Sequence, residues 1–347
     1  MKILPYILAA IGLLISNTAK AELIILSAPR TGDPYYTKVA DGIFSFHIKY
    51  AKKIIESGDD VLILTDKGAY GRYKKALGEH RVILAPVSDI WMRDFGMSNT
   101  VSPLMFRYTA TAQGGGQKGQ RDADTVQADL ALFAERAGLD FKETDLFNDG
   151  GNFVDDYAGN VVVSRKFLRD NKLTEQHARD KLRKFTGIRQ VAFIEADEQG
   201  GLEHADGVVS FVETNTLIIN SYPTDPEYSH NLKTVLKSSL PGVKIHEIIT
   251  PYDGSKTHDD RFGSACGLYT NALVTPKRIY LPQFGIPEDK IAMAQVNAIT
   301  EKEVVPIDSR DVCFMGGGVR CMSWQLRGAN AQRLLSYKAS LITKQSQ

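Results

Sequence analysis

The chain has 347 residues, and its 42 Lys and Arg against 41 Asp and Glu give a net charge of +1. A near-neutral balance with interspersed signs excludes the basic surface typical of nucleic-acid-binding proteins and gives no electrostatic attraction to an anionic membrane. Three cysteines in a chain of this length do not form a disulfide scaffold. We therefore expect a hydrophobic core to provide the stability, and no nucleic acid as a partner.

The first 21 residues have the pattern of a secretory signal peptide. Lys2 supplies a positive charge, residues 3–15 form an apolar run, and Ala19-Lys20-Ala21 matches a small-residue cleavage site. The apolar run is shorter than the roughly 20 residues needed to span a bilayer. We predict a signal peptide at 1–21 and a single secreted or periplasmic domain at 22–347 that leaves the membrane after cleavage. An N-terminal core helix or a membrane anchor is the alternative.

Strands and helices alternate in the first quarter of the mature chain. Short apolar runs at 23–26, 61–64 and 82–84 are typical of buried strands. Between them, apolar residues at helical spacing predict helices at 40–57 and 70–77. This alternation indicates the α/β class.

Beyond residue 90 the pattern changes to hairpin-like units, which are expected at 93–108, 150–164, 204–220 and 269–282. Helices are expected between them, at 125–137, 177–185, 228–240 and 287–298. Gly-rich residues 112–119 are expected to form a flexible loop.

Five chemically capable residues stand at or near the expected strand starts: Asp94, Asn152, Asp206, Asn271 and Cys321. Their separations of 58, 54, 65 and 50 residues suggest repeated supersecondary units arranged around a centre. A plain doubly wound sheet with irregular hairpins is the alternative. If the units converge on an axis, these five side chains converge as well.

Cys321 follows three consecutive glycines, Gly316 to Gly318, which let the backbone turn tightly and present a thiol to a cleft. An odd number of cysteines leaves at least one thiol unpaired within the chain, whereas a Cys266–Cys313 disulfide is neither required nor excluded. A free cysteine is more often buried and inert than catalytic. In a strand, Arg320 would point away from the face of Cys321.

Two further segments carry chemistry. If His204-Ala205-Asp206 is a strand, the histidine and the carboxylate share one face, and the histidine can titrate near neutrality. Trp91 and Asp94 combine an aromatic face with a carboxylate, which suits a planar cation. Each alone is equally consistent with surface residues at a turn or with a salt bridge at a strand end.

Together these residues specify one reaction. Two carboxylates grip a guanidinium and orient its central carbon, a thiolate attacks that carbon, and a histidine protonates the leaving ammonia and then activates water. Asp94, Asp206, Cys321 and His204 meet those four requirements. The amides of Asn152 and Asn271 are candidate substrate ligands, although capping roles are common at such positions.

The segments WMRDFG (91–96), GGN (150–152), HAD (204–206), YTNALV and LPQFG (269–285) and GGGVRC (316–321) together resemble the agmatine deiminase and bacterial Porphyromonas-type peptidylarginine deiminase family. The resemblance implies a pentein α/β propeller of five ββαβ-type units, with no metal and no cofactor. It further implies that Asp94 and Asp206 bind the guanidinium, His204 is the general acid/base and Cys321 the nucleophile. Asn271 then matches the family's active-site amide, and Trp91 its aromatic wall.

The substrate stays open between agmatine, free arginine and peptidyl-arginine. Arg320 stands where the family commonly has histidine, and Met97 where a proline is usual. For a peptidyl substrate, Arg107 is the candidate cation for a C-terminal carboxylate. A periplasmic binding protein, an amidinotransferase and a papain-like cysteine protease are the alternatives. The papain-like order of Cys, His and Asn differs from the order here.

Overall fold

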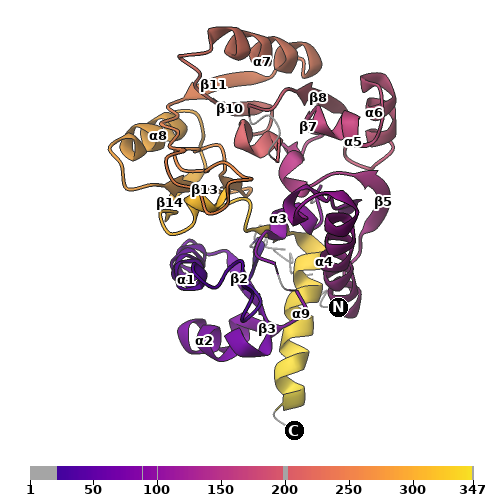
Figure 1. Cartoon of the computed structure of the whole chain (residues 1–347), viewed down its shortest axis with the longest axis vertical. Helices are drawn as coiled ribbons and strands as arrows, with labels where there is room; N and C mark the ends of the chain where they lie inside the picture. The colour runs from indigo at the N-terminus through magenta and orange to yellow at the C-terminus, as the bar shows by residue number, and fades with distance from the viewer. Residues whose placement is uncertain (1–21, 88, 100, 198–201, 346–347) are drawn as a thin grey trace, which may run out of the picture.

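The computed structural model describes residues 22–87, 89–99, 101–197 and 202–345, so the predicted signal peptide at 1–21 lies outside the described residues. Within these ranges the strands form five small sheets. In Figure 1 the sheets follow one another around a centre close to the short helix α3 (Met92–Phe95). In the same ranges, no helix is both long and apolar enough to cross a membrane.

Three of the sheets have the same construction, in which an antiparallel hairpin is followed by a helix and a parallel strand. Their strands are β6 (Val154–Asp155), β7 (Asn160–Ser164) and β8 (Gln190–Ile194); β9 (Val209–Glu213), β10 (Thr216–Asn220) and β11 (Lys244–Ile248); and β12 (Leu273–Val274), β13 (Arg278–Gln283) and β14 (Glu303–Asp308). The crossover helices are α5 (Lys166–Asp170) with α6 (Glu175–Leu182), α7 (Pro226–Ser239) and α8 (Glu288–Asn297). This is the expected ββαβ unit.

The remaining two sheets join the chain ends and complete the circle. β15 (Trp324–Leu326) pairs antiparallel with β1 (Leu23–Ser27), which runs parallel to β2 (Asp60–Thr65), and β3 (Val82–Leu84) follows at the edge. β4 (Leu104–Arg107) runs parallel to β5 (Lys142–Phe147), and a single bridge from Ser98 to Leu104 stands in for its hairpin. The fold is therefore the pentein α/β propeller.

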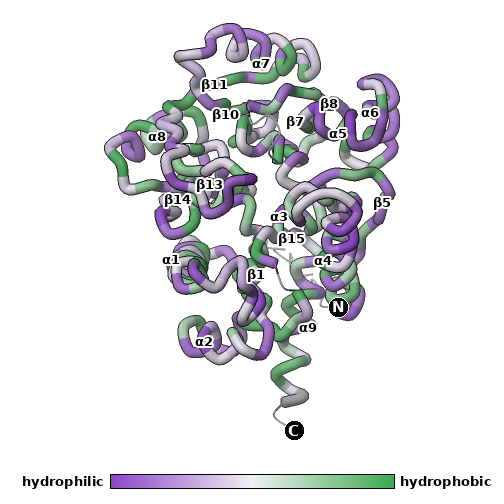
Figure 2. Tube along the Cα trace, in the orientation of Figure 1, coloured by the Kyte–Doolittle hydropathy of each residue, from purple (hydrophilic) through white to green (hydrophobic). Residues whose placement is uncertain are grey.

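Burial follows the sequence pattern. The strand residues of β1 are all buried, as are Val61 to Thr65 in β2, which is typical of strands covered on both faces. Helix α1 (Ala40–Glu56) buries Ile43, Phe46, Tyr50 and Ile54 at three- and four-residue spacing. α6 is hydrophilic along most of its length in Figure 2, as expected for a helix on the outside. Two further helices belong to the sheet that contains β1. Helix α2 (Lys67–Leu77) lies between β2 and β3 in the chain, and the C-terminal helix α9 (Gly328–Gln345) follows β15.

Three predicted strand starts are wrong, because the chain turns there instead of extending. Met92–Phe95 is the helical turn α3, and Gly150–Asn152 and Ala205–Gly207 are the 3-10 turns η3 and η4. η3 packs directly on α3, where a Cβ on Gly150 would lie 2.0 Å from the carbonyl oxygen of Arg93. These turns bring the backbone to the centre before each antiparallel strand begins.

The Gly-rich loop expected at 112–119 is also wrong. The 3-10 turn η2 (Thr111–Gln113) leads into the helix α4 (Gly116–Arg136), whose first turn includes Lys118. The positive φ angles of Gly114 and Gly115 turn the chain between these two elements, which explains the glycines without a flexible loop.

Candidate active site

Five turns, one from each repeated unit, meet at the centre of the propeller. Asp94 lies on α3 and Asp206 on η4, whereas Asn271 and Cys321 lie just before β12 and β15. Backbone hydrogen bonds join the turns directly: Arg93 N donates to the carbonyl oxygen of Cys321 at 3.0 Å. Of the five residues expected to converge, the structure brings four side chains to the same cavities, those of Asp94, Asp206, Asn271 and Cys321.

The thiol of Cys321 lies at the junction of two cavities. Cys321 is 7% exposed, Asn271 Nδ2 donates to Sγ at 3.0 Å, and Sγ lies 3.8 Å from Asp206 Oδ2. A Cβ on Gly317 would lie 2.5 Å from the indole of Trp91 and 2.9 Å from the Cβ of Cys321. Glycine is therefore required at this position, because any side chain would collide with both Trp91 and Cys321.

We name the two cavities after a residue of each. The Trp91 lobe, of about 470 Å³, includes Trp91 and Asp94 in its walls. The His204 lobe, of about 530 Å³, includes His204, Asp206 and Asn271. Gly316 and Cys321 line both. Each lobe thus contributes one carboxylate beside the same thiol, which is the arrangement needed to hold a planar cation from two sides.

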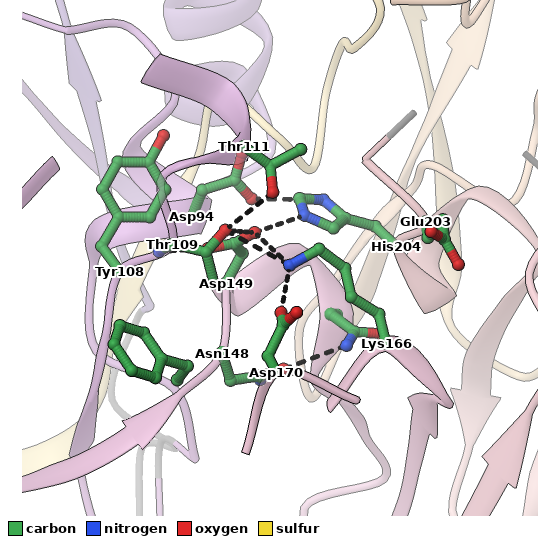
Figure 3. A network of polar contacts seen from close by, with 12 residues as sticks. Asp94, Tyr108, Thr109, Thr111, Asn148, Asp149, Lys166, Asp170, Glu203 and His204 are labelled. Carbon is green, nitrogen blue, oxygen red and sulfur yellow. Dashed lines mark hydrogen bonds and ion pairs between the residues drawn. The ribbon is translucent and has the colours of Figure 1, made fainter. Parts of the chain in front are cut away.

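His204 is buried between two carboxylates, as Figure 3 shows. Its Nε2 lies 3.0 Å from Asp149 Oδ2, and its Nδ1 lies 3.6 Å from Asp94 Oδ1. A Cβ on Gly151 would lie 2.5 Å from Nδ1 and 2.8 Å from Asp94 Oδ1, so the second glycine of the GGN segment leaves room for this pair. Gly151 N also donates to Asp94 Oδ1 at 3.1 Å.

The charges of this group shift each other's protonation. Burial disfavours the imidazolium, but Asp94 and Asp149 outweigh it and raise the pKa of His204 to about 9. Burial raises the pKa of Asp94 to about 7, although His204 opposes the shift. At neutral to mildly alkaline pH the histidine is therefore an acid that can donate a proton, and Asp94 is an acceptor.

The thiol itself is protonated in the unliganded site. Burial and the carboxylates of Asp206 and Asp94 raise the pKa of Cys321 well above its ordinary value, whereas Asn271 and Arg320 act in the opposite direction. A bound cation between the carboxylates would cancel the second cause. The site is therefore built to form a thiolate when a cation is present.

Arg320 does not point away from the site, as the strand interpretation predicted. Residues 320 and 321 lie in a turn, and Arg320 Nη1 donates to Asp206 Oδ2 at 2.7 Å. Nη2 donates to the carbonyl oxygen of Phe153 at 2.7 Å. The guanidinium therefore holds Asp206 from behind, with its side chain only 9% exposed.

Two predicted substrate ligands do not join the others. Arg107 forms a two-point ion pair with Asp124, is partly exposed, and lies outside the walls of both lobes. Asn152 is buried, and its Oδ1 accepts from the backbone N–H groups of Ser164 and Ala205. The amide of Asn152 is thus used to anchor η4 beside His204, because buried turns need partners for their backbone donors.

Asp149 was missed by the sequence analysis. It is 1% exposed, its Oδ1 accepts from Thr109 N and its Oδ2 from the Thr109 hydroxyl, and it orients His204 through Nε2. Burial opposes its ionisation, but the hydrogen bond with His204 and the charge of Lys166 lower its pKa below the ordinary value. Its position directly before the GGN segment was the available signal.

A disulfide joins Cys266 to Cys313 close to the site, and Cys321 is the free cysteine among the described residues. The disulfide links the segment of Ser264, in the wall of the His204 lobe, to the turn that precedes Gly316. In the described part of the chain, no group of three or more His, Cys, Asp or Glu side chains is placed to hold a metal ion.

A thiol, an imidazole and two carboxylates at the centre of a pentein propeller define a hydrolase that acts on the C–N bonds of linear amidines, a guanidino-group deiminase. The chain belongs to the Porphyromonas-type peptidyl-arginine deiminase family, whose sequence model matches residues 14–326.

Known relatives agree with this assignment. A Vibrio parahaemolyticus protein, named provisionally as an agmatine deiminase, is 24% identical over 282 residues, which cover 71% of this chain and 78% of that protein. A Lactococcus lactis protein with the same provisional name is 24% identical over 79% of this chain and 84% of its own length. The solved agmatine deiminase of Enterococcus faecalis has the same fold, with a TM-score of 0.73 at 18% identity over 89% of this chain and 93% of that one.

Proposed function

We propose that the enzyme converts the guanidinium of a small arginine-like molecule to a ureido group and ammonia through a covalent intermediate on Cys321. The observation that carries this proposal is the position of the Cys321 thiol. It lies where the Trp91 lobe, which contains Asp94, meets the His204 lobe, which contains Asp206. Both carboxylates fix the guanidinium nitrogens, and Trp91 covers the face of the planar cation. The central carbon is thereby held next to Sγ.

The first half-reaction forms a C–S bond. Binding of the cation offsets the negative charges of Asp94 and Asp206, which lowers the pKa of the thiol, so that its proton is released to water and is later taken up by the ammonia to give ammonium. The thiolate attacks the guanidinium carbon, and the resulting tetrahedral carbon expels one amino group. His204, protonated at neutral pH, supplies the proton with which that group leaves as ammonia.

The second half-reaction releases the S-alkylthiouronium. His204, now neutral, takes a proton from a water molecule, and the hydroxide adds to the same carbon. The C–S bond breaks, the hydroxyl proton of the adduct passes to the departing thiolate and restores the thiol, and the neutral ureido product leaves. The sum is guanidinium plus water giving ureido compound plus ammonium, so neither a metal nor a redox cofactor enters the balance.

Among guanidines, the charges of the Trp91 lobe favour a cationic tail. Its cations, Lys118 and Arg261, are each paired with a carboxylate, Asp122 and Asp259 respectively. Asp89 is a buried carboxylate in the same wall. The negative charge of this wall favours binding of a substrate amine. A substrate carboxylate could pair with a cation there only by breaking an existing ion pair. We therefore propose a guanidinoalkylamine such as agmatine, in keeping with the names of the relatives, as the preferred substrate rather than peptidyl-arginine.

We further propose that the mature enzyme acts outside the cytoplasm. The signal-peptide pattern of residues 1–21 supports export. The Cys266–Cys313 disulfide supports an oxidising compartment, because such bonds rarely persist among cytosolic thiols.

A product assay tests the reaction and the substrate together. Purified protein is incubated with agmatine, butylguanidine, free arginine, and peptides with C-terminal or internal arginine, and ammonia and ureido products are measured. Agmatine should exceed butylguanidine, which has the same carbon chain without the amine, by at least about tenfold in kcat/KM. Higher activity on a C-terminal peptidyl-arginine would reject the amine assignment but keep the deiminase reaction.

The nucleophile is tested by two substitutions. Cys321→Ser and Cys321→Ala should abolish both products while agmatine still binds in calorimetry, because the carboxylates remain. Undiminished ammonia release by Cys321→Ala would exclude the covalent mechanism. Transfer of the amidino group to an added amine without ammonia release would point to an amidinotransferase instead.

A further inference from the structure

Lys166 is a buried cation next to Asp149, the partner of His204. The reaction as proposed above assigns it no role. It begins α5, and its side chain is 8% exposed. Its Nζ lies 2.5 Å from Asp170 Oδ2, 3.3 Å from Thr109 Oγ1 and 3.9 Å from Asp149 Oδ2. Figure 3 shows this ammonium and the imidazole of His204 both directed at the carboxylate of Asp149. Burying a lysine is costly, so an ammonium held at this point calls for a reason.

The ammonium fixes the direction of the hydrogen bonds around Asp149. Because an ammonium can only donate, Thr109 Oγ1 must accept from Lys166, and its single proton is free for another acceptor. That acceptor is Asp149 Oδ2 at 2.8 Å, since the Thr111 hydroxyl is farther away at 3.4 Å. Thr109 N donates to Asp149 Oδ1 at 2.9 Å. Asp149 is thereby an acceptor at both oxygens.

This direction carries through to the imidazole. If Asp149 only accepts, then His204 Nε2 at 3.0 Å must carry a proton and donate it. The other nitrogen, Nδ1, faces Asp94 at 3.6 Å on the side of the cavity. Nδ1 is therefore the nitrogen that gives a proton to the leaving ammonia and takes one from water. The same logic links a buried aspartate to the tautomer of a catalytic histidine in serine proteases.

We propose that Lys166 is a positioning residue that, through Thr109 and Asp149, holds His204 in the Nε2-protonated tautomer and limits its basicity. The proposal rests on the proposed function, because it assigns a proton-transfer nitrogen to that reaction.

The limit on basicity follows from the charges that face the imidazole. They are Asp94 from α3, Asp149 before η3, Asp206 on η4 with its partner Arg320, and Lys166 from α5. The carboxylate of Glu203 points away from the ring in Figure 3 and is paired with Arg169. The three site carboxylates favour the imidazolium. Lys166 Nζ lies 3.9 Å from Asp149 Oδ2, the atom that contacts His204 Nε2, and its positive charge at this short range disfavours a second cation on the ring. Without Lys166 the imidazolium becomes a weaker acid toward the leaving amine.

The test is the pH profile of Lys166→Met, in which the aliphatic stem is kept and the charge removed. The basic limb of kcat/KM for agmatine should move upward by about one unit, because a cation near the imidazolium is lost. At neutral pH, kcat should fall roughly tenfold with KM nearly unchanged, as expected for an outer partner of a catalytic histidine. Lys166→Arg should restore the position of the limb.

Lys302→Met is the matched control. Lys302 is also a largely buried lysine, 13% exposed and paired with Glu213 at 3.6 Å, but it lines neither lobe. It should leave the limb in place. Asp170→Asn changes a partly exposed residue and keeps Lys166, but it removes the carboxylate that is ion-paired with the ammonium. The positive charge of Lys166 is then less compensated, so the basic limb should move slightly downward. A limb that stays at the wild-type pH in both Lys166→Met and Asp170→Asn overturns the proposal, even if the rate falls.

A substrate-independent measurement separates this proposal from the proposed function. The ring resonances of His204, assigned by their loss in His204→Asn, are titrated by NMR in the wild type and in Lys166→Met. The midpoint should rise in Lys166→Met, and the wild-type nitrogen shifts above that midpoint should report a protonated Nε2. A protonated Nδ1 there would overturn the proposal. Absence of turnover with every guanidine would instead reject the function and leave this result intact.

Discussion

Arg320 Nη1 lies 2.7 Å from Asp206 Oδ2, so the residue before the nucleophile is ion-paired with a carboxylate that faces the nucleophile. The same guanidinium donates to the carbonyl oxygen of Phe153 at 2.7 Å. It therefore links the turn of Cys321 to η4 and to Phe153, the residue between η3 and β6. It also lowers the pKa of the thiol, against the larger effect of burial.

Arg320→Met should destabilise the fold and impair the nucleophile. Removing one partner of a buried ion pair leaves Asp206 uncompensated, which costs about 3–5 kcal/mol. Denaturant unfolding measures this loss. Arg320→Lys retains the charge but not the two-point geometry and should lose less. An unchanged midpoint in Arg320→Met would show that the pair adds no stability.

The pH dependence of kcat/KM should be bell-shaped. Activity is lost as the pH falls below about 7, because Asp94 is protonated, and it is lost above about 9, because His204 loses its proton. Stopped assays with agmatine between pH 5 and pH 10 check both limbs. In kcat the acidic limb should lie lower, since the bound cation stabilises ionised Asp94. An acidic limb at the ordinary pKa of an aspartate would contradict the role of burial.

Gly151→Ala should remove activity while the fold remains. The added Cβ would lie 2.5 Å from His204 Nδ1 and 2.8 Å from Asp94 Oδ1, so the two side chains must separate. A displacement of this size costs on the order of 100-fold in kcat. The control is Gly71→Ala in α2, where nothing lies within 4 Å, and which should stabilise the helix by about 1 kcal/mol. Equal activity in the two variants would contradict the crowded geometry.

Loss of the disulfide should lower stability and substrate affinity together. The bond closes a loop with a sequence separation of 47, for which the chain-entropy relation gives about 4 kcal/mol. Cys266→Ser combined with Cys313→Ser should therefore lower Tm, and it should raise KM because Ser264 and Gly316 line the cavities. A reductant should lower Tm in the wild type but not in the double variant. Identical melting of both proteins in oxidising buffer would contradict the prediction.

Much of the propeller could be predicted from the sequence because its elements have strong local patterns. The continuous apolar runs of β1 and β2 and the helical spacing of α1 predict those elements within a residue or two. The turns α3, η3 and η4 could not be predicted, because a turn of three or four residues has no period. Their conformation is set by packing at the centre, such as that of Gly150 on Arg93.

The candidate site divides in the same way. Cys321, His204, Asp94 and Asp206 could be selected because the residue types and their spacing suit one reaction. Arg107 and Asn152 could not be rejected, since their partners Asp124, Ser164 and Ala205 become neighbours only in the folded chain.

By itself, the sequence determined which side chains can carry out the chemistry and that five similar units bring them to one place. Only the tertiary structure decided which charges surround these side chains and how deeply they are buried. Asp149 and Lys166 stand behind His204, and Arg320 stands behind Asp206, in contacts between units up to 114 residues apart. Burial and charge act through space and depend on distance rather than on chain position, so no local pattern reveals them.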